Sequence, residues 1–295
     1  MSLRDDMLNA KILAVKIRLD VVRMIGKSGQ TGHLGGSCSS ADFVAALYSG
    51  IMSFNPAKPE WRGRDKFIYS KGHAAIAQYA AMAEVGFFPV EELKTVKTLG
   101  SRLQGHPDRM KTPGVEAGTG SLGQGLSIAN GMALALRLDR SSGSVYCVMG
   151  DGEMNEGQIW EAAMSAAHFR LENVIGIVDK NRLQATGFCD DRMKSEPLAD
   201  KWRSFGWNVI EIDGHDMKQI FAAFSEAKMN TGNPSVIIAN TVKGKGVSFA
   251  ENNAAFHNGA LSEEHYALAI KELSDELESL LREKKQLEVP AQKRS

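Results

Sequence analysis

Apolar residues in the first third of the chain recur at helical spacing. Between Met7 and Ile25 they lie three or four positions apart, which predicts an amphipathic helix that ends near Gly26. Residues 27–40 are rich in glycine and serine and predict a loop, after which a serine caps a helix that runs to about residue 52. Residues 65–86 then predict a short strand, a turn and an alanine-rich helix.

Further along the chain, strands and helices alternate. Residues 121–138 have helical periodicity, and the segments that follow alternate between runs of β-forming residues and amphipathic helices. These segments are 144–149, 156–169, 173–179, 200–206, 208–213, 217–229 and 234–240. The alternation predicts an α/β fold, with a doubly wound, mainly parallel sheet and helices on both of its faces.

A last helix is predicted beyond Ser262. Ser262 can cap it, two glutamates stand in its first turn, and one apolar face is formed by Ile270, Leu273, Leu277, Leu280 and Leu281. We expect this face to pack on the helix's own domain, the alternative being a stripe for a partner chain. The charged tail after Arg282 is expected to fray. The chain thus divides into a domain at residues 1–262 and a C-terminal helix with its tail at residues 263–295.

Composition and charge narrow the class of protein. A chain of 295 residues, 43% of them hydrophobic, can bury an ample core. Lys plus Arg and Asp plus Glu both total 35, so no overall charge favours nucleic acid or an anionic membrane as a partner. The N-terminal segment lacks the apolar run of a signal peptide or a membrane span, and three scattered cysteines fit no disulfide framework or zinc site. These features predict a globular protein of the cytoplasm.

An acid between two glycines follows the strand predicted at "VYCVM": Gly150, Asp151 and Gly152. In a parallel sheet the carboxyl ends of the strands border the ligand crevice, and the next strand brings Asn181 to the same edge. A carboxylate, an amide oxygen and a main-chain carbonyl such as that of Leu183 suit Mg²⁺ or Ca²⁺ but are too few to enclose it. A ligand diphosphate would supply the missing oxygens, and the following helix N-terminus favours such an anion. The alternative is an acid that serves only the turn.

A second glycine cluster, "GTGSLGQG", competes for the same phosphate. Gly118, Gly120 and Gly123 have the spacing of a dinucleotide-binding loop, and Asp139 stands where the ribose acid would be expected. No strand is predicted before the cluster, however, and Asp139 precedes the next strand instead of ending it. We interpret the cluster as a loop whose backbone faces a ligand. The alternatives are a plain loop and, more remotely, a nicotinamide site.

Four of the seven histidines stand in glycine-flanked loops: His33, His73, His106 and His257. A single loop histidine is usually a solvated surface residue, but four in loops expected to meet at one sheet edge indicate a shared role. Imidazoles titrate near neutral pH and can exchange protons with sugar hydroxyls and with a developing alkoxide. The other three, which we assign to structure, are His168, His215 and His265.

The segment "GDGEMNEGQIWEAAMSAAHFRLENVIGIVDKN" resembles the thiamine-diphosphate motif, in which G-D-G is followed further along by two asparagines. Lys180 replaces the first asparagine, while Asn181 keeps the second. Other segments resemble successive landmarks of the transketolase family, in its order: "GHLGGS", "YSKGHA", "QGHPD", "GTGSLGQG" and "TVKGKG…FHNGA". The resemblance runs from about residue 10 to residue 260 and covers the family's N-terminal, diphosphate-binding domain. It implies the thiamine-diphosphate-binding fold.

The resemblance also implies roles for individual residues. The positions that match the family's cofactor-binding residues are His73, Gly120, Ser121, Leu122, Gly152, Glu153, Asn181 and His257. The implied ligands of the Mg²⁺ or Ca²⁺ ion are Asp151, Asn181 and the carbonyl of Leu183. The implied catalytic residues, which contact the ketose, are His33, His106 and His257. His257 departs from the family pattern, because this chain has His257-Asn258-Gly259 where the family has His-Gly.

Charged residues near these motifs have plainer alternatives. Glu156 and Glu161 are expected on a helix surface, although Glu156 matches a family position at the subunit interface. Lys243 and Lys245 in "KGKG" could balance phosphate charge, but we expect solvated lysines.

The family's catalytic machinery extends beyond this domain. In the family, a glutamate of a second domain assists proton transfer at the cofactor's aminopyrimidine. Only 33 residues follow Ser262, too few for a pyrimidine-binding domain. We therefore expect the N-terminal subunit of a split transketolase, which moves a two-carbon ketol unit between sugar phosphates only with a separate C-terminal subunit, in a heterotetramer. The alternatives are the α subunit of a 2-oxo-acid dehydrogenase, against which the histidines argue, and a catalytically silent cofactor-binding subunit.

Overall fold

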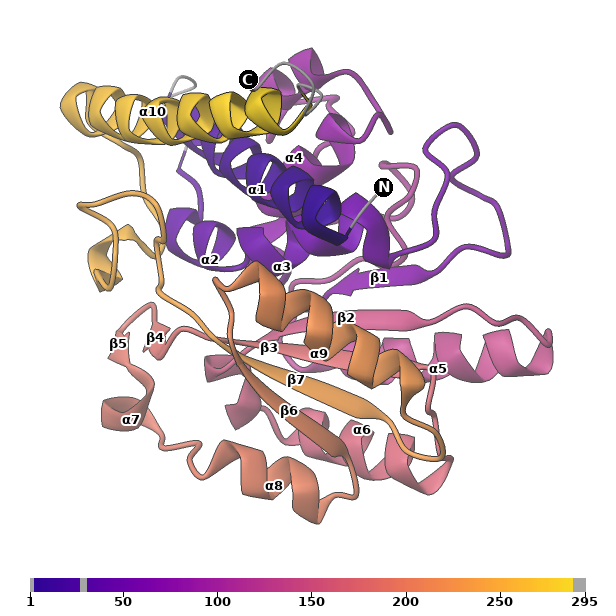
Figure 1. Cartoon of the computed structure of the whole chain (residues 1–295). Coiled ribbons are helices and arrows are strands. Elements are labelled where there is room, and N and C mark those ends of the chain that lie inside the picture. The colour runs from indigo at the N-terminus through magenta and orange to yellow at the C-terminus, as the bar shows by residue number, and fades with distance from the viewer. Residues whose placement is uncertain (1–2, 27–30, 289–295) are drawn as a thin grey trace, which may run out of the picture.

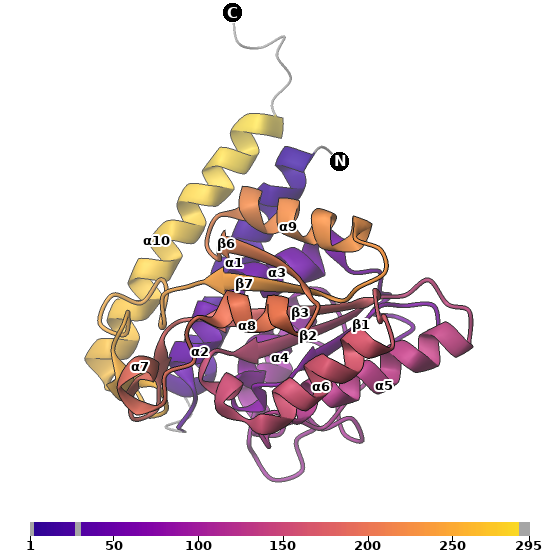
Figure 2. The same ribbon diagram turned by 90° about the horizontal axis from the view of Figure 1, so that it is seen from below.

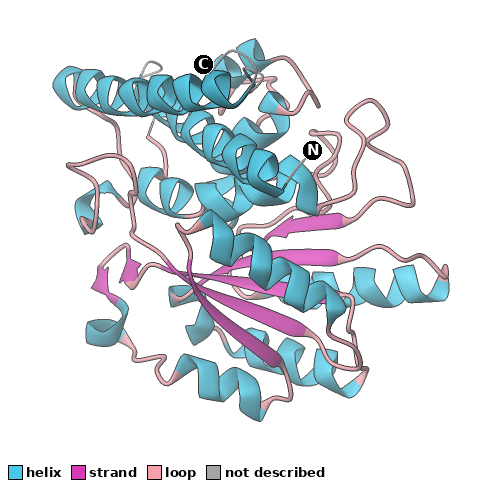
Figure 3. Ribbon diagram, in the orientation of Figure 1, coloured by secondary structure: helices cyan, strands magenta, loops and turns pink. Residues whose placement is uncertain are grey.

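The computed structural model describes residues 3–26 and 31–288. Within them, five strands form one parallel sheet in the order β1-β2-β3-β7-β6 (Figures 1 and 3). The strands are β1 Lys66–Tyr69, β2 Val145–Gly150, β3 Val174–Lys180, β6 Asn208–Asp213 and β7 Ser235–Asn240. A small antiparallel pair, β4 Leu183–Gln184 and β5 Gly187–Phe188, is an addition to the predicted elements. The predicted α/β fold with a mainly parallel sheet is confirmed.

Helices cover both faces of the sheet. Side chains alternate along each strand, so that Tyr146 and Val148 of β2 enter one core while Cys147 and Met149 enter the other. The first core is covered by α1 Leu3–Gly26, α2 Leu34–Ser39, α3 Ala41–Ala46, α4 Ala75–Glu84 and α9 Met217–Met229. The second is covered by α5 Gln124–Leu138, α6 Gly157–His168 and α8 Leu198–Ser204. Figure 2 shows α1, α3 and α9 on one side of the sheet and α5 and α6 on the other.

Shorter helical segments occupy the connections. They are η1 Leu47–Ile51, η2 Gly72–Ala74, η3 Val90–Thr95, η4 Gly152–Asn155, α7 Cys189–Arg192 and η5 Ala254–Phe256. Across residues 3–26 and 31–288, no helix has the length and apolarity that crossing a bilayer requires.

The glycine- and serine-rich segment differs from its prediction. Residues 34–39 form α2 instead of a loop; the whole helix is buried, and Ser39 Oγ donates to Asp179 Oδ2 of β3 (2.6 Å). Ser37 Oγ donates to the carbonyl of His33 (2.6 Å) and Ser40 Oγ to that of Gly36 (2.9 Å). Ser40 therefore does not cap α3 with its side chain, and the predicted serine cap is wrong there. Residues 27–30 of the predicted loop lie outside the described residues.

The C-terminal helix α10, Glu263–Glu288, packs along α1 (Figure 1). Ser262 Oγ accepts a hydrogen bond from the main-chain N–H of His265 (3.2 Å), so the predicted cap is present. Ala269 and Leu273 are buried in the first core, as expected for a helix that packs on its own domain. The helix continues past Arg282 to Glu288, so the expected fraying is not seen up to that residue, and residues 289–295 lie outside the described chain. The division at residue 262 stays a prediction.

Asp20 on α1 is a buried acid whose charge costs stability. Its Oδ1 accepts a hydrogen bond from Arg23 (3.0 Å), whereas Oδ2 is buried without a partner. Burial, followed by the charge of Glu84, raises the pKa of Asp20 from 3.8 to about 6. Because this acid has a higher pKa folded than unfolded, the folded state binds more protons between about pH 4 and pH 6, and stability falls as the pH rises through that window.

We expect Asp20→Asn to raise the free energy of unfolding at pH 7.5 by about 1–2 kcal/mol, since the amide keeps an acceptor for Arg23 and removes the buried charge. Urea unfolding of both chains at pH 7.5 and pH 4 measures it. The gain should vanish at pH 4, and equal stability of the two chains at pH 7.5 would contradict the expectation.

Candidate functional site

The carboxyl ends of three neighbouring strands define the candidate site. Gly150 of β2 pairs with Asp179 of β3, and Lys180 pairs with Asn240 of β7. This register brings the segments that follow the three strands to one edge of the sheet. The prediction that Asp151 and Asn181 emerge on adjacent strands at the same edge is confirmed by the strand order.

Asp151 and Asn181 border a single turn. Asp151 Oδ1 accepts from the N–H of Gly152 (2.9 Å), and its Oδ2 accepts from the N–H of Arg182 (2.5 Å). Asn181 Oδ1 accepts from the N–H of Leu183 (3.1 Å). The three predicted metal-ligand residues are thus within one hydrogen-bonded loop, and all three are buried.

The donor set suits a divalent cation. Burial, followed by the negative charge of Asp179, raises the pKa of Asp151 to about 6, a cost that a bound cation would relieve. The carbonyl of Leu183 accepts a hydrogen bond from the ammonium of Lys243, so a cation that used this oxygen would have to displace that contact. The described residues include no cluster of three or more His, Cys, Asp or Glu side chains placed to hold a metal. A cation at this edge would therefore depend on the one carboxylate of Asp151 together with amide, main-chain and ligand oxygens, and this donor set stays a prediction.

Glu153 ties the glycine cluster to the sheet edge. Its carboxylate, which is buried, accepts from the hydroxyl of Ser70, the N–H of Gly123 (2.8 Å) and the N–H of Gly150 (3.0 Å). Burial raises the pKa of this carboxyl group. Side-chain contact of Glu153 with a cofactor stays a prediction, and the structure shows its carboxylate engaged in holding three segments together.

The segment with Gly120, Ser121 and Leu122 lies in that held loop, directly before α5. Gly120 has φ +154°, and a Cβ there would lie 2.9 Å from the His106 ring. Gly123 has φ +86° and stands at the start of α5. No strand lies between β1 and α5, so the strand that a nicotinamide fingerprint requires is absent from this described stretch.

Three of the four loop histidines form one cluster. The ring centroids of His33 and His73 are 4.9 Å apart, and each lies 5.4 Å from that of His257. Burial, reinforced by nearby positive charges, lowers the pKa values of His33, His73 and His257 to about 4, 2 and 3. All three are therefore neutral at physiological pH, and each ring has one N–H donor and one acceptor nitrogen without carrying charge.

His106 adjoins the cluster without joining its ring contacts. Its ring faces Gly120, and its main-chain carbonyl accepts from Tyr79 Oη (3.1 Å). Burial, followed by the charge of Lys97, lowers its pKa. The expectation that the four loops meet at one edge therefore agrees with the geometry, while the catalytic and cofactor roles of these residues stay predictions.

Residues outside the predicted site also reach this edge. Lys71 and Asp179 form a buried ion pair beneath it, and Ser39 and Thr241 donate to Asp179. Sequence reasoning missed all four. The available signal was a polar residue at the end of an apolar strand, as in "FIYSK" and "VIGIVDK".

The remaining assignments differ in outcome. Lys243 is buried and donates to the Leu183 carbonyl and toward His257 Nδ1 (2.7 Å), so the expectation of a solvated lysine is wrong, because the turn after β7 directs it inward. Lys245 is half-exposed. Glu156 and Glu161 are exposed, as a helix surface requires.

The three histidines assigned to structure make structural contacts. His215 Nδ1 lies 2.7 Å from Asp42 Oδ2, and His215 Nε2 accepts from the N–H of Val242 (2.8 Å). His265 stacks on Phe249, with ring centroids 4.2 Å apart. His168 is exposed beside Phe169.

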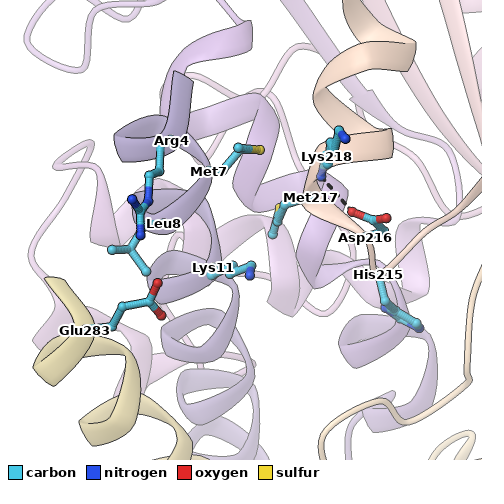
Figure 4. A pocket seen from close by; sticks show the side chains of 9 residues that line it. All are labelled: Arg4, Met7, Leu8, Lys11, His215, Asp216, Met217, Lys218 and Glu283. Atoms are coloured by element: carbon cyan, nitrogen blue, oxygen red, sulfur yellow. Dashed lines mark hydrogen bonds between the residues drawn. The ribbon is translucent and has the colours of Figure 1, made fainter. Parts of the chain in front are cut away.

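A separate pocket lies between α1, α9 and α10 (Figure 4). Its lining is mixed in charge and consists of Arg4, Met7, Leu8, Lys11, His215, Asp216, Met217, Lys218 and Glu283. Asp216 already caps α9 by accepting from the N–H of Lys218 (2.8 Å), so the helix end is occupied. No residue of the candidate site lines this pocket.

Comparison with known proteins bears on the function of this edge. The family described as transketolase, thiamine diphosphate binding domain, matches residues 9–280. The 6-deoxy-6-sulfo-D-fructose transketolase subunit of Clostridium sp. (strain MSTE9) is 47% identical over 88% of this chain and 94% of its own length. A subunit of the apulose-4-phosphate transketolase of Phocaeicola vulgatus is 40% identical over 91% of this chain and 95% of its own length.

Solved structures agree with the sequence relatives. The transketolase of Campylobacter jejuni superposes with a TM-score of 0.81 at 28% identity, over 99% of this chain and 50% of that chain. The transketolase of Leishmania mexicana gives a TM-score of 0.79 at 29% identity, over 97% of this chain and 46% of that chain. This chain thus spans about half the length of these transketolases. These findings support the transketolase interpretation over the 2-oxo-acid dehydrogenase alternative. The chain belongs to the transketolase family and corresponds to its N-terminal, thiamine-diphosphate-binding domain.

Proposed function

We propose that this chain is the N-terminal subunit of a two-chain transketolase, which transfers a two-carbon ketol unit from a ketose to an aldose through thiamine diphosphate. The observation that carries the proposal is how much of each relative this chain covers. The chain covers 94% and 95% of two relatives named as transketolase subunits, but only 46–50% of two solved transketolases. The cluster of neutral histidines beside a diphosphate-binding edge supplies groups that this chemistry needs.

The chain would hold the cofactor's diphosphate end. Asp151, Asn181 and the Leu183 carbonyl would bind Mg²⁺ or Ca²⁺, while Gly152 and the loop at residues 120–122 would bring main-chain groups to the phosphates. His73 would face the same diphosphate. When bound, thiamine diphosphate supplies a nucleophilic carbon that the protein itself lacks.

The substrate would lie over the histidine cluster. His33, His106 and His257 would donate to the ketose hydroxyls and to the carbonyl oxygen as charge develops there. Because burial lowers the pKa values of His33 and His257 to about 4 and 3, these rings are neutral near pH 7, and each would offer one N–H donor and one acceptor nitrogen to the ketose. His257 also contacts the ammonium of Lys243, so the substrate and cofactor ends of the site are connected.

A partner chain would complete the site. The proposed partner is a C-terminal transketolase subunit that carries the pyrimidine-binding domain and its catalytic glutamate, assembled with this chain into a cytoplasmic heterotetramer. The exposed Glu156 would lie at a subunit interface of this assembly. Neither nucleic acid nor a membrane has a role in it.

Reconstitution tests the proposal. The purified chain alone should transfer ketol units at a negligible rate, since a positioned proton-transfer group is typically worth about 10²–10⁴ in rate and the partner supplies it. Adding the partner subunit should restore turnover, measured by coupled detection of the aldose product. Robust turnover by the chain alone would contradict the two-chain proposal.

The substrate panel separates the remaining alternatives. Two relatives are named for 6-deoxy-6-sulfo-D-fructose and apulose-4-phosphate, so the donors to assay are a sulfonated ketose and phosphorylated ketoses. Decarboxylation of pyruvate or a branched 2-oxo acid without ketol transfer would favour the dehydrogenase subunit. Cofactor binding without any turnover in the assembled enzyme would favour a catalytically silent subunit.

A further inference from the structure

A buried ion pair lies directly behind the predicted metal ligand Asn181. The side chains of Lys71 and Asp179 are 3% and 0% exposed, and the Lys71 ammonium contacts Asp179 Oδ2. The same ammonium donates to the carbonyl of Gly36 (2.7 Å). Lys71 follows β1 and Asp179 belongs to β3, so the pair spans β2, which lies between these strands.

Asp179 collects donors from four parts of the fold. In addition to Lys71, Ser39 Oγ of α2 donates to Oδ2 (2.6 Å), and the hydroxyl of Thr241, after β7, donates to Oδ1. The fourth donor is Asn181 Nδ2, at 3.0 Å from Oδ2. The carboxylate is therefore immobilised, and one of the groups that it holds is the amide of Asn181.

These contacts allow only one orientation of the Asn181 amide. Its Nδ2 faces a carboxylate, and its Oδ1 faces the N–H of Leu183. A flipped amide would place oxygen against the carboxylate and NH₂ against a donor, so both contacts would become repulsive. Since only oxygen can bind a hard cation, the flipped amide would also lose its function as a ligand.

The positive charge of Lys71 explains how a buried carboxylate, that of Asp179, can hold the amide of Asn181. Asp179 lies next to Asp151, the other predicted ligand residue: the N–H of Asp151 donates to the main-chain carbonyl of Asp179 (3.3 Å), and both residues are buried. A second uncompensated carboxylate at this depth would be costly, because a buried charge without a partner destabilises the fold. Lys71 neutralises Asp179, so the amide is oriented without additional net negative charge beside Asp151.

We propose that Lys71 and Asp179 are a positioning pair that holds the amide oxygen of Asn181 toward the cofactor's metal ion and thereby sets the metal affinity of the site. This inference rests on the proposed function. Both residues are buried, and the pair acts through Asn181. A purely structural ion pair would instead contribute to folding and leave the metal dependence unchanged.

The test is the metal dependence of thiamine diphosphate binding in the chain assembled with its partner subunit. Titrations of the cofactor at stepped Mg²⁺ concentrations give the Mg²⁺ midpoint, and thermal melts of the same samples report folding. Asp179→Asn should raise the Mg²⁺ midpoint by about 10–100-fold, the usual effect of removing a group that orients a metal ligand. Saturating Mg²⁺ should restore the cofactor affinity.

Asp42→Asn is the matched control. Asp42 forms another buried pair, with Arg18, and it makes no contact with Asn181. This variant should lower the melting temperature without moving the Mg²⁺ midpoint. If Asp179→Asn does not fold, Ser39→Ala and Thr241→Val keep both charges, remove one donor each, and should raise the midpoint by a smaller factor.

The outcomes separate the two proposals. An unchanged Mg²⁺ midpoint in folded Asp179→Asn, or in both milder variants, would overturn the positioning role. So would a loss of cofactor affinity that saturating Mg²⁺ does not restore. A wild-type assembly that binds thiamine diphosphate without any Mg²⁺ dependence, or not at all, would refute the proposed cofactor site itself.

Discussion

Asp151→Asn should bind thiamine diphosphate at least about 100-fold more weakly at limiting Mg²⁺, since a direct metal ligand should matter at least as much as the groups that orient one. The substitution keeps an oxygen in place but removes the negative charge that attracts the cation. The loss should be largest at low Mg²⁺ and should shrink as Mg²⁺ approaches saturation.

The same variant should not be less stable than the wild type by more than a small margin. Burial and the charge of Asp179 raise the pKa of Asp151 to about 6, so ionised Asp151 is unfavourable in the folded chain above that pH. An asparagine at this position loses one acceptor oxygen, and with it the hydrogen bond from the N–H of either Gly152 or Arg182. The stability gained by removing the buried charge offsets that loss. Weak cofactor binding with a nearly unchanged melting temperature would be a signature that a folding defect cannot produce.

Calorimetric titration of the assembled enzyme measures this effect, with Asp190→Asn as control. Asp190 is an exposed acid that lines the same pocket as Asp151 but is not one of the predicted metal ligands. It should leave cofactor affinity unchanged. Equal affinities for wild type and Asp151→Asn at every Mg²⁺ concentration would remove Asp151 from the metal site.

Glu153→Ala should destabilise the chain by about 3–5 kcal/mol, because three buried donors would each lose an acceptor at about 1–3 kcal/mol apiece. The donors are Ser70 Oγ and the N–H groups of Gly123 and Gly150. For a chain of this size the melting temperature should fall by roughly 10 °C. Cofactor affinity should fall as well, since the loop before α5 would lose its anchor.

Glu153→Gln should be much milder. The amide oxygen can still accept from Ser70 and Gly123, and the change removes a buried charge whose pKa burial has raised. Only the contact with the Gly150 N–H would become unfavourable. Thermal melts rank the variants, with Glu161→Ala on the exposed side of α6 as the neutral control. Equal melting temperatures for Glu153→Ala and the control would show that the three contacts of Glu153 contribute nothing to stability.

The fold could be predicted from the sequence because its central strands, β2, β3 and β7, are buried on both faces. Segments such as "VYCVM" and "NVIGIVD" are almost continuously apolar, and amphipathic helices separate them, which is the pattern of a parallel sheet. The α2 segment could not be predicted in this way. The segment is buried and Ser39 Oγ donates to Asp179, a tertiary partner that is invisible to a local reading of "GHLGGSCSS".

The site could be predicted only where a residue has an unusual local context. Asp151 stands between glycines at a strand end, and the loop histidines share a glycine-rich context. Asp179 lies inside an apolar strand, and Lys71 follows one, so each alone gives a weak signal. The two residues form their ion pair across β2, and this pairing requires the strand order β1-β2-β3, which the local sequence does not show. Lys243 was expected in solvent for the same reason, because its partners Leu183 and His257 are remote in sequence.

The pairing of Gly150 with Asp179 also has a practical meaning for engineering. In this parallel register the candidate site lies at the carboxyl ends of the strands. The short connections at residues 139–144 and 230–234, which lead into β2 and β7, lie at the opposite edge of the sheet. Several residues of these connections are exposed, among them Arg140, Ser142 and Asn233, and none of the connections' residues belongs to the candidate site. A short tag for immobilisation therefore belongs in one of these connections, where the added residues stay away from the candidate site.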